Sequence, residues 1–342
     1  MSTLAEPQSS TILPGPDGGT LLGFLCALGA LAVFQRVFAN ESVRLAWHNK
    51  DGWHPQIRVG DRDVAPSDIP ALFAELTREA GRERFRIPAN PKSKQVKSLL
   101  EDRYYLNPDH VSVEDYAAKA ASLDRDSSDF LAAIGGPVET SSTAAIEATA
   151  FCALGSSQQY FFKAARELSQ KPAQPNTAAK KESRRKTSPP DDPATIEEHL
   201  SAALFRPWTY THPASGMRWD TAEDRRHALR WNDPSPDPIW TERGANRLAI
   251  EALSFFPTAP GRRGLQTTAF SEHHQRGYVS WPVWSPLLSS DAVKSLVTHA
   301  EFATLRPRRK AHAPLGVEEV FRCERMQKAK QVNFSVAMPC LD

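Results

Sequence analysis

The pattern of apolar residues is most distinctive near the start of the chain. Residues 20–35 read TLLGFLCALGALAVFQ, with no charged side chain and no polar face before Gln35. A helix that is apolar all round is buried on every side. The run is shorter than the roughly 20 apolar residues that span a membrane, and Asp17 stands where a signal peptide carries basic residues. We therefore expect a core helix here, preceded by a loose terminus over residues 1–19.

Downstream, the spacing of apolar residues predicts a mixture of strands and helices. In VRLAWHNKDGWHPQIRV, residues 43–59, two alternating stretches flank an Asn-Lys-Asp-Gly turn, which is typical of a β-hairpin. Ser67 and Pro70 introduce an amphipathic helix over residues 70–81. Further helices are predicted at residues 113–122, 128–134, 143–169, 196–205, 246–253 and 291–299, and strands at residues 265–270, 278–284, 317–323 and 332–338. The fold class that follows is α+β.

A change of composition divides the chain. Its length of 342 residues fits two domains. Residues 171–193 contain no large apolar side chain, which predicts a basic, Pro-rich linker between an N-terminal helix-plus-hairpin domain over 20–170 and a second mixed α+β domain over 194–342. The same segment could instead be an insertion in one larger fold. Its basic residues are expected to contact phosphate non-specifically, and they are Lys180, Lys181, Arg184, Arg185 and Lys186.

Composition and missing motifs exclude several classes of protein. Hydrophobic residues make up 40% of the chain and charged residues 24%, which excludes wholesale disorder, and a net charge of +2 excludes a wholly basic surface. The chain has no phosphate-binding loop, no H-E-x-x-H, no G-x-S-x-G and no C-x-x-C pair. We expect no catalytic residues, no metal and no cofactor. The four separated cysteines fit a reducing cytoplasm.

One acidic segment allows a competing interpretation. Asp220, Glu223 and Asp224 lie close together in WDTAEDRRHALRWNDPS and could hold magnesium for a nuclease. Arginines surround them, however, so we favour a network of ion pairs.

Arginines, glutamines and glycines concentrate in the C-terminal half. Arg side chains suit phosphate and base contacts, and adjacent glycines let a backbone approach a groove closely. The residues expected to face DNA are Arg225, Arg226, Asn246, Arg247, Arg262, Arg263, Gln266 and Arg276, together with the cluster Arg308, Arg309 and Lys310. A competing interpretation is structural: Asn246 caps a helix, and Arg247 pairs with Glu251 one turn later. Tryptophans in the same half could stack on bases, although we favour a role in the core.

Several of these segments resemble a known family. The opening LLGFLCALGAL, the strand VRLAW and the WHPQI element are similar to the start of CRISPR-associated large subunits, in particular those of type I-G systems, formerly called I-U. The segments WDTAEDRRHALRWNDPS, RGANRLAIEALSFFPTAP, LQTTAF and VFRCERMQKAKQVNFSVAMP extend the likeness over most of the chain. Large subunits of other type I systems usually end in a helical bundle, whereas this C-terminus is predicted to form strands.

The resemblance implies a non-catalytic subunit of Cascade, an RNA-guided DNA surveillance complex. Such a subunit recognises a target-adjacent duplex motif (PAM), stabilises the displaced strand of the R-loop and recruits a helicase-nuclease. The partners implied are guide RNA, target double-stranded DNA, backbone and other Cascade subunits and the helicase-nuclease, in the cytoplasm and without a membrane. The alternatives are the metal-dependent nuclease and a scaffold subunit that binds only proteins.

Overall fold

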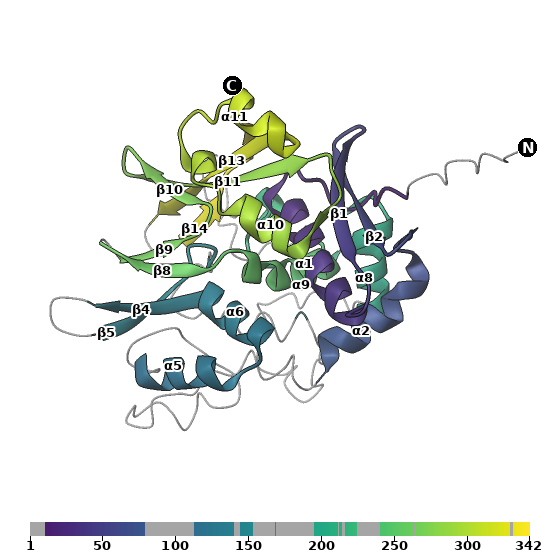
Figure 1. The fold of residues 1–342 in the computed structure, drawn as a ribbon, viewed down its shortest axis with the longest axis horizontal. Helices are drawn as coiled ribbons and strands as arrows, with labels where there is room; N and C mark the ends of the chain where they lie inside the picture. The colour runs from purple at the N-terminus through teal and green to yellow at the C-terminus, as the bar shows by residue number, and fades with distance from the viewer. Residues whose placement is uncertain are drawn as a thin grey trace, which may run out of the picture.

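A computed structural model of the chain describes residues 11–78, 113–139, 144–152, 168, 195–210, 212–213, 216–223, 240–262, 264–328 and 331–342. Helices and antiparallel sheets are both present, so the predicted α+β class is confirmed (Figure 1). The helices of at least eight residues are α1 (Leu21–Val37), α2 (Ile69–Thr77), α5 (Val113–Ser122), α6 (Arg125–Ile134), α8 (Ile196–Phe205), α9 (Arg243–Glu251) and α10 (Ser290–Val297). Shorter helical turns are η1 (Pro66–Asp68), η3 (Thr221–Glu223), η4 (Ala252–Phe255), η5 (Ala300–Ala303), α11 (Arg309–His312) and η6 (Ala313–Leu315).

The strands form two larger antiparallel sheets and several hairpins. The first sheet has the order β12–β1–β2–β3, and the second has the order β10–β11–β13–β14, with β15 also paired to β13. Their bounds are β1 (Val43–Asn49), β2 (Trp53–Val59), β3 (Arg62–Asp63), β10 (Phe270–His273), β11 (Arg276–Trp284), β12 (Leu288–Ser289), β13 (Val317–Lys328), β14 (Gln331–Phe334) and β15 (Met338–Pro339). The remaining pairs are β4 (Gly135–Glu139) with β5 (Ala144–Ala148), β6 (His212–Pro213) with β7 (Trp240–Thr241), and β8 (Thr258–Gly261) with β9 (Gly264–Thr267).

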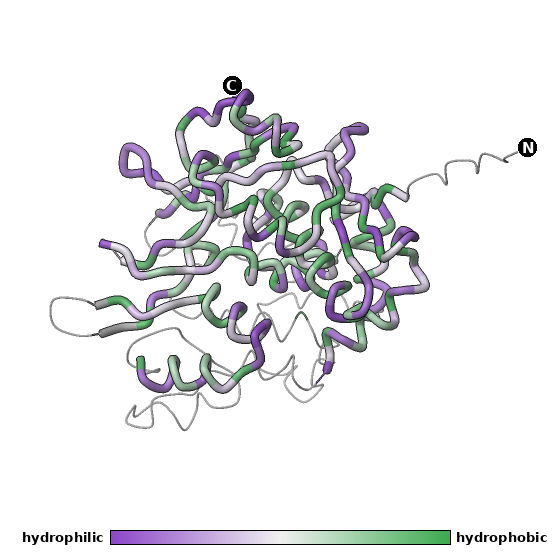
Figure 2. Tube along the Cα trace, in the orientation of Figure 1, coloured by the Kyte–Doolittle hydropathy of each residue, from purple (hydrophilic) through white to green (hydrophobic). Residues whose placement is uncertain are grey.

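Helix α1 lies at the centre of the molecule, as its apolar sequence predicts. All residues from Leu21 to Phe34 are buried, and the hydroxyl of Thr20 caps the helix by accepting from the Gly23 N–H at 3.1 Å. Its neighbour is α9, which it crosses so closely that a Cβ atom on Gly29 would stand 1.8 Å from the carbonyl oxygen of Leu248. Figure 2 shows the hydrophobic residues of this region enclosed by hydrophilic surface segments. Among the described helices, none is long and apolar enough to cross a membrane.

Both halves of the chain contribute to one apolar core. Two buried indole groups join them: Trp281 donates to the Gly18 carbonyl at 2.7 Å, and Trp284 donates to the Leu45 carbonyl at 2.9 Å. A single cluster of buried residues extends from Leu13 to Phe334. The proposed linker, residues 171–193, lies outside the described residues. The two predicted domains are therefore joined through a shared core wherever the structure describes them.

Tryptophans are prominent in this core. Trp219, Trp281 and Trp284 are buried, which confirms the predicted core role for these three, whereas Trp240 is exposed. Their large rings remove much apolar surface from water, and their N–H groups find carbonyl partners.

Two predicted elements differ from the structure. The strand predicted over residues 265–270 is interrupted, because β9 ends at Thr267 and β10 begins at Phe270. The helix predicted over residues 143–169 is wrong at its start. The expected helix over residues 143–169 is replaced at its start by β5, which pairs with β4 in the register Gly135↔Ala148 to Glu139↔Ala144. The sequence AAIEA has strong helical propensity, but Ile146 is buried on this strand, and pairing with β4 overrides the local preference. The helix predicted from Ser67 is present as η1 and α2, although no side chain caps α2.

Candidate nucleic-acid interface

Three hairpins, β4–β5, β8–β9 and β10–β11, extend toward the same side of the molecule (Figure 1). The first two are joined by side chains. The Glu147 carboxylate on β5 accepts from the Leu265 N–H on β9 at 2.8 Å, and the Ala150 N–H donates to the Thr267 hydroxyl at 2.9 Å. These bonds hold neighbouring hairpins in a fixed relation, so the residues near their tips form one surface.

A groove of about 1040 Å³ separates hairpin β8–β9 from hairpin β10–β11 and from η5. The half-buried ring of Phe270 lines it, and polar amides come from Gln266, Gln275 and Gln327. Phe302 also borders the groove, but it is 2% exposed and packs against His299 and His312. A surface with an aromatic ring and amides beside arginines offers stacking and hydrogen bonding to bases together with attraction for phosphate. We refer to this feature as the hairpin groove.

Arg262 lines the hairpin groove from the end of β8. It is exposed, and no carboxylate among the described residues forms an ion pair with it. Glycines stand on either side of the turn: a Cβ on Gly261 would come within 2.6 Å of the Gln266 side chain, and Gly264 has a φ of +115°. The left-handed backbone at Gly264 favours glycine, whereas a Cβ on Gly261 would displace only the exposed Gln266 side chain. Arg262, which follows Gly261, is open to solvent.

Two further arginines near the groove differ in availability. Arg276 is 64% exposed, and its one ion pair with a described residue is a long contact to Glu324, at 3.4 Å. Arg325 instead donates to the carbonyls of Ala150 and Cys152, at 2.8 and 3.3 Å. Burial lowers the pKa of Arg325. Arg276 is available to an anionic ligand, whereas Arg325 fastens the segment that follows β5 to β13.

Asn246 and Arg247 are buried in α9, so the prediction that they lie on a DNA-facing surface is wrong. Asn246 is 0% exposed; its amide oxygen accepts from the Met217 N–H at 2.8 Å, and its nitrogen donates to Thr241 at 2.8 Å. Arg247 is 1% exposed and pairs with Glu251 at 2.9 Å, as the i,i+4 alternative predicted. The predicted helix cap at Asn246 is also wrong, because α9 begins at Arg243.

The cluster Arg308, Arg309 and Lys310 lies near the C-terminus, in and beside α11 and away from the hairpin tips (Figure 1). All three side chains are exposed. Arg308 pairs with Glu301 at 3.1 Å, and Arg309 pairs with Glu319 at 3.6 Å. Because carboxylates already offset two of the three charges, this cluster attracts phosphate less strongly than its sequence suggests.

Other predicted nucleic-acid-binding residues lie outside the described residues. They are Lys180, Lys181, Arg184, Arg185, Lys186, Arg225, Arg226 and Arg263. The hairpin groove thus contains Arg262 and Gln266 from the predicted set, with Arg276 at the neighbouring turn.

The acidic segment does not form a metal site where it is described. The two carboxylate oxygens of Asp220 accept from the Tyr210 hydroxyl at 2.9 Å and from the Ala222 N–H at 2.8 Å. Asp224 lies outside the described residues, and the part of the chain that the structure describes contains no group of three or more metal-ligating side chains. Where it is described, the segment offers hydrogen bonds to its own backbone and to a tyrosine.

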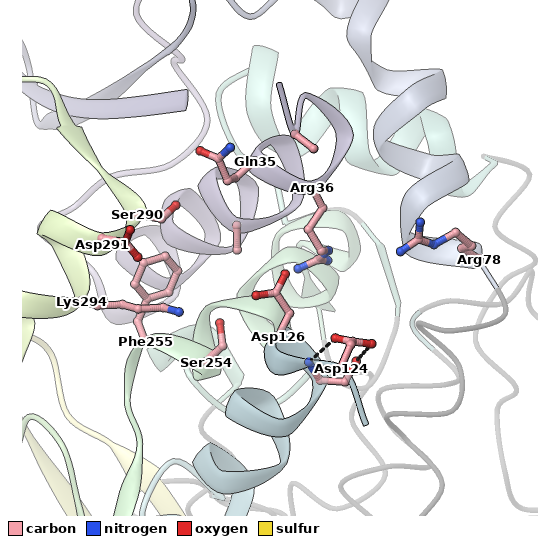
Figure 3. A pocket seen from close by; sticks show the side chains of 13 residues that line it. Gln35, Arg36, Arg78, Asp124, Asp126, Ser254, Phe255, Ser290, Asp291 and Lys294 are labelled. Atoms are coloured by element: carbon pink, nitrogen blue, oxygen red, sulfur yellow. Dashed lines mark hydrogen bonds between the residues drawn. The ribbon is translucent and has the colours of Figure 1, made fainter. Parts of the chain in front are cut away.

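A second cavity, of about 430 Å³, lies between α1, α6 and α10 (Figure 3). Arg36, Arg78 and Lys294 line it, but so do three aspartates. Arg36 already binds Glu75 and Glu251, and Lys294 binds Asp129 at 3.3 Å. Its basic groups are thus matched by acidic ones, so a polyanion gains little there.

Sequence reasoning missed His274 and Gln275, which form the turn between β10 and β11. Both are exposed and both have positive φ, 50° and 64°. The only sequence signal was the short polar run SEHHQRG between two strands, which lacks the Asn-Gly pair typical of such a turn. No protein-family model matches the chain, and no curated protein and no solved structure matches it either. The interpretation of the groove therefore rests on its chemistry.

Proposed function

We propose that the protein is a non-catalytic large subunit of a type I-G CRISPR surveillance complex and that its hairpin groove binds target DNA. In this role it contacts the duplex beside the target site, stabilises the displaced strand and recruits a helicase-nuclease, with guide RNA and the other Cascade subunits as partners in the cytoplasm. The sequence resemblance supports the assignment to this class of complex, and the hairpin groove is the surface that we assign to DNA binding.

The observation that carries the proposal is the composition of the hairpin groove. An exposed Arg262 without a carboxylate partner among the described residues lines the same groove as Gln266 and the half-buried ring of Phe270. Phosphate contacts position a nucleic acid, and amide and aromatic groups contact its bases. The second cavity also has arginines, a glutamine and a phenylalanine, but its arginines already pair with carboxylates. Two of the three basic side chains of the Arg308 cluster are paired in the same way.

Salt-dependent binding of DNA tests this assignment. Each lysine or arginine that neutralises a phosphate releases counterions, which contributes about 0.9 to the slope of log K against log salt. The variant Arg262→Ala should lower the slope by about one such unit. The matched control is Arg125→Ala, since Arg125 is 88% exposed but pairs with Asp129 at the start of α6, beside the second cavity. Equal slopes for wild type and Arg262→Ala would contradict a phosphate contact at the groove.

A further inference from the structure

The turn between β10 and β11 has an unfavourable backbone for its sequence. His273 pairs with Arg276, so the loop consists of only His274 and Gln275. Both residues adopt a left-handed backbone conformation, with φ of 50° and 64°. A two-residue loop with positive φ at both positions strongly prefers Asn-Gly, because most L side chains crowd the backbone there. Histidine tolerates a positive φ better than most residues, so the cost falls mainly on Gln275. The fold alone gives no reason for a glutamine at that position.

Other hairpins in the same chain use residues that suit their turns. The loop between β1 and β2 places Asp51 at φ 54° and Gly52 at φ 129°. Hairpin β8–β9 has Gly264 at φ 115°. Aspartate and glycine tolerate these conformations at little cost, so the left-handed positions described in these two hairpins carry residues that suit them. The β10–β11 turn is the exception among these three.

The side chains of His274 and Gln275 make no contribution to packing that would offset this cost. Both residues are exposed, and within the described part of the chain neither side chain has a hydrogen-bond partner. The strand beside them is fastened: Nε2 of His273 donates to the Ala303 carbonyl at 2.8 Å. The base of the turn is thus fixed while its two central side chains remain available, and Gln275 lines the hairpin groove.

Backbone strain retained without a structural gain is characteristic of positions selected for contact with a ligand. We propose that His274 and Gln275 contact the bases of nucleic acid bound in the hairpin groove. An imidazole ring stacks on bases, and a glutamine amide supplies both a donor and an acceptor to a base edge. This inference rests on the proposed function, because it assigns two base-contacting residues to the same groove.

The test replaces the strained pair by the residues that its turn prefers. In the double variant His274→Asn/Gln275→Gly, relief of strain should raise Tm by about 2 °C. Binding is measured with short single-stranded DNA and with the matching duplex. Without the two base-contacting side chains, the affinity for at least one of these forms should fall at least fivefold. The form whose affinity falls is the form that the turn contacts. The control Asp51→Asn changes another left-handed turn residue and should leave both Tm and affinity unchanged.

Each outcome has a distinct meaning. A raised Tm with weakened binding supports the inference. A raised Tm with wild-type affinity for both DNA forms overturns the inference and leaves the proposed function standing, provided that Arg262→Ala still lowers the salt slope. A lowered Tm shows that the native pair suits its turn and also overturns the inference. Absence of DNA binding by the wild-type chain overturns the proposed function together with the inference.

Discussion

Removal of the Glu251 carboxylate should destabilise the protein more than removal of Arg247. Glu251 is 2% exposed and accepts from two cations, Arg247 at 2.9 Å and Arg36 at 2.7 Å. Burial by itself lowers the pKa of Arg36, but the carboxylates of Glu251 and Glu75 outweigh this effect and hold that pKa above its usual value. Arg36 is charged in the folded protein, and these carboxylates offset the cost of taking its charge out of water.

The magnitude follows from which charges are left without a partner. The variant Glu251→Leu takes a buried carboxylate from Arg247 and leaves Arg36 with Glu75 at 3.1 Å, so it should cost about 3–5 kcal/mol. In Arg247→Leu the Glu251 carboxylate keeps Arg36, so the cost should be smaller, about 1–3 kcal/mol.

Urea denaturation measures both costs, provided that the slope m stays constant so that a change in midpoint reports stability. The double variant Arg247→Leu/Glu251→Leu should cost less than the sum of the single variants, because each residue's partner is removed with it. If Glu251→Leu is no more destabilising than Arg247→Leu, the account of a carboxylate shared by the buried Arg247 and the partly buried Arg36 is wrong.

Three further predictions address the core, the pH dependence and the basic segment. The variant Gly29→Ala should destabilise the protein by about 1–3 kcal/mol or more in urea denaturation, because its Cβ would lie 1.8 Å from the Leu248 oxygen. The control Gly277→Ala should be almost neutral, because the nearest atom to its Cβ would be 3.7 Å away. Equal costs for the two variants would contradict the close crossing of α1 and α9. His312 is 0% exposed, and its pKa is lowered below the ordinary 6.5 by burial and, next, by repulsion from His299. The free energy of unfolding should therefore have its full value above pH 6.5 and decrease as the pH falls, until the folded-state pKa is reached. The decrease should be at most about 1.4 kcal/mol per pH unit. His312→Phe should remove this decline, and an unchanged pH profile would refute the assignment. The basic segment contains Lys180, Lys181, Arg184, Arg185 and Lys186. Neutralising these five residues should lower the slope of log K against log salt for DNA binding by about 0.9 for each phosphate contact that is lost. An unchanged slope would contradict the predicted role of the segment.

The predictions from sequence succeeded where one local signal agreed with the tertiary environment. Residues 21–34 are apolar on all sides and are buried on all sides, and the alternating pattern around the Lys50 turn forms β1 and β2. The AAIEA segment failed because its helical propensity is local, whereas its pairing with β4 is a tertiary contact. Arg247 was ambiguous for a similar reason: its spacing from Glu251 fits an ion pair, but burial depends on α1 packing against α9.

The candidate site was only partly predictable. Arg262 and Gln266 were identified because arginines and glutamines beside glycines are visible in the sequence. The His274 and Gln275 turn was missed because its significance lies in two positive φ angles, which residue types alone do not reveal. Convergence of β8–β9 and β10–β11 on one groove likewise depends on contacts between segments distant in sequence.

Isolation of the tagged full-length chain from its native cells, followed by sequencing of bound RNA and identification of bound proteins, tests the central proposal most directly. Membership of a surveillance complex predicts that the chain is recovered with processed guide RNA of uniform length and with backbone subunits that coat it. Recovery without guide RNA, under conditions in which the other subunits of that complex remain bound to it, would contradict the proposal.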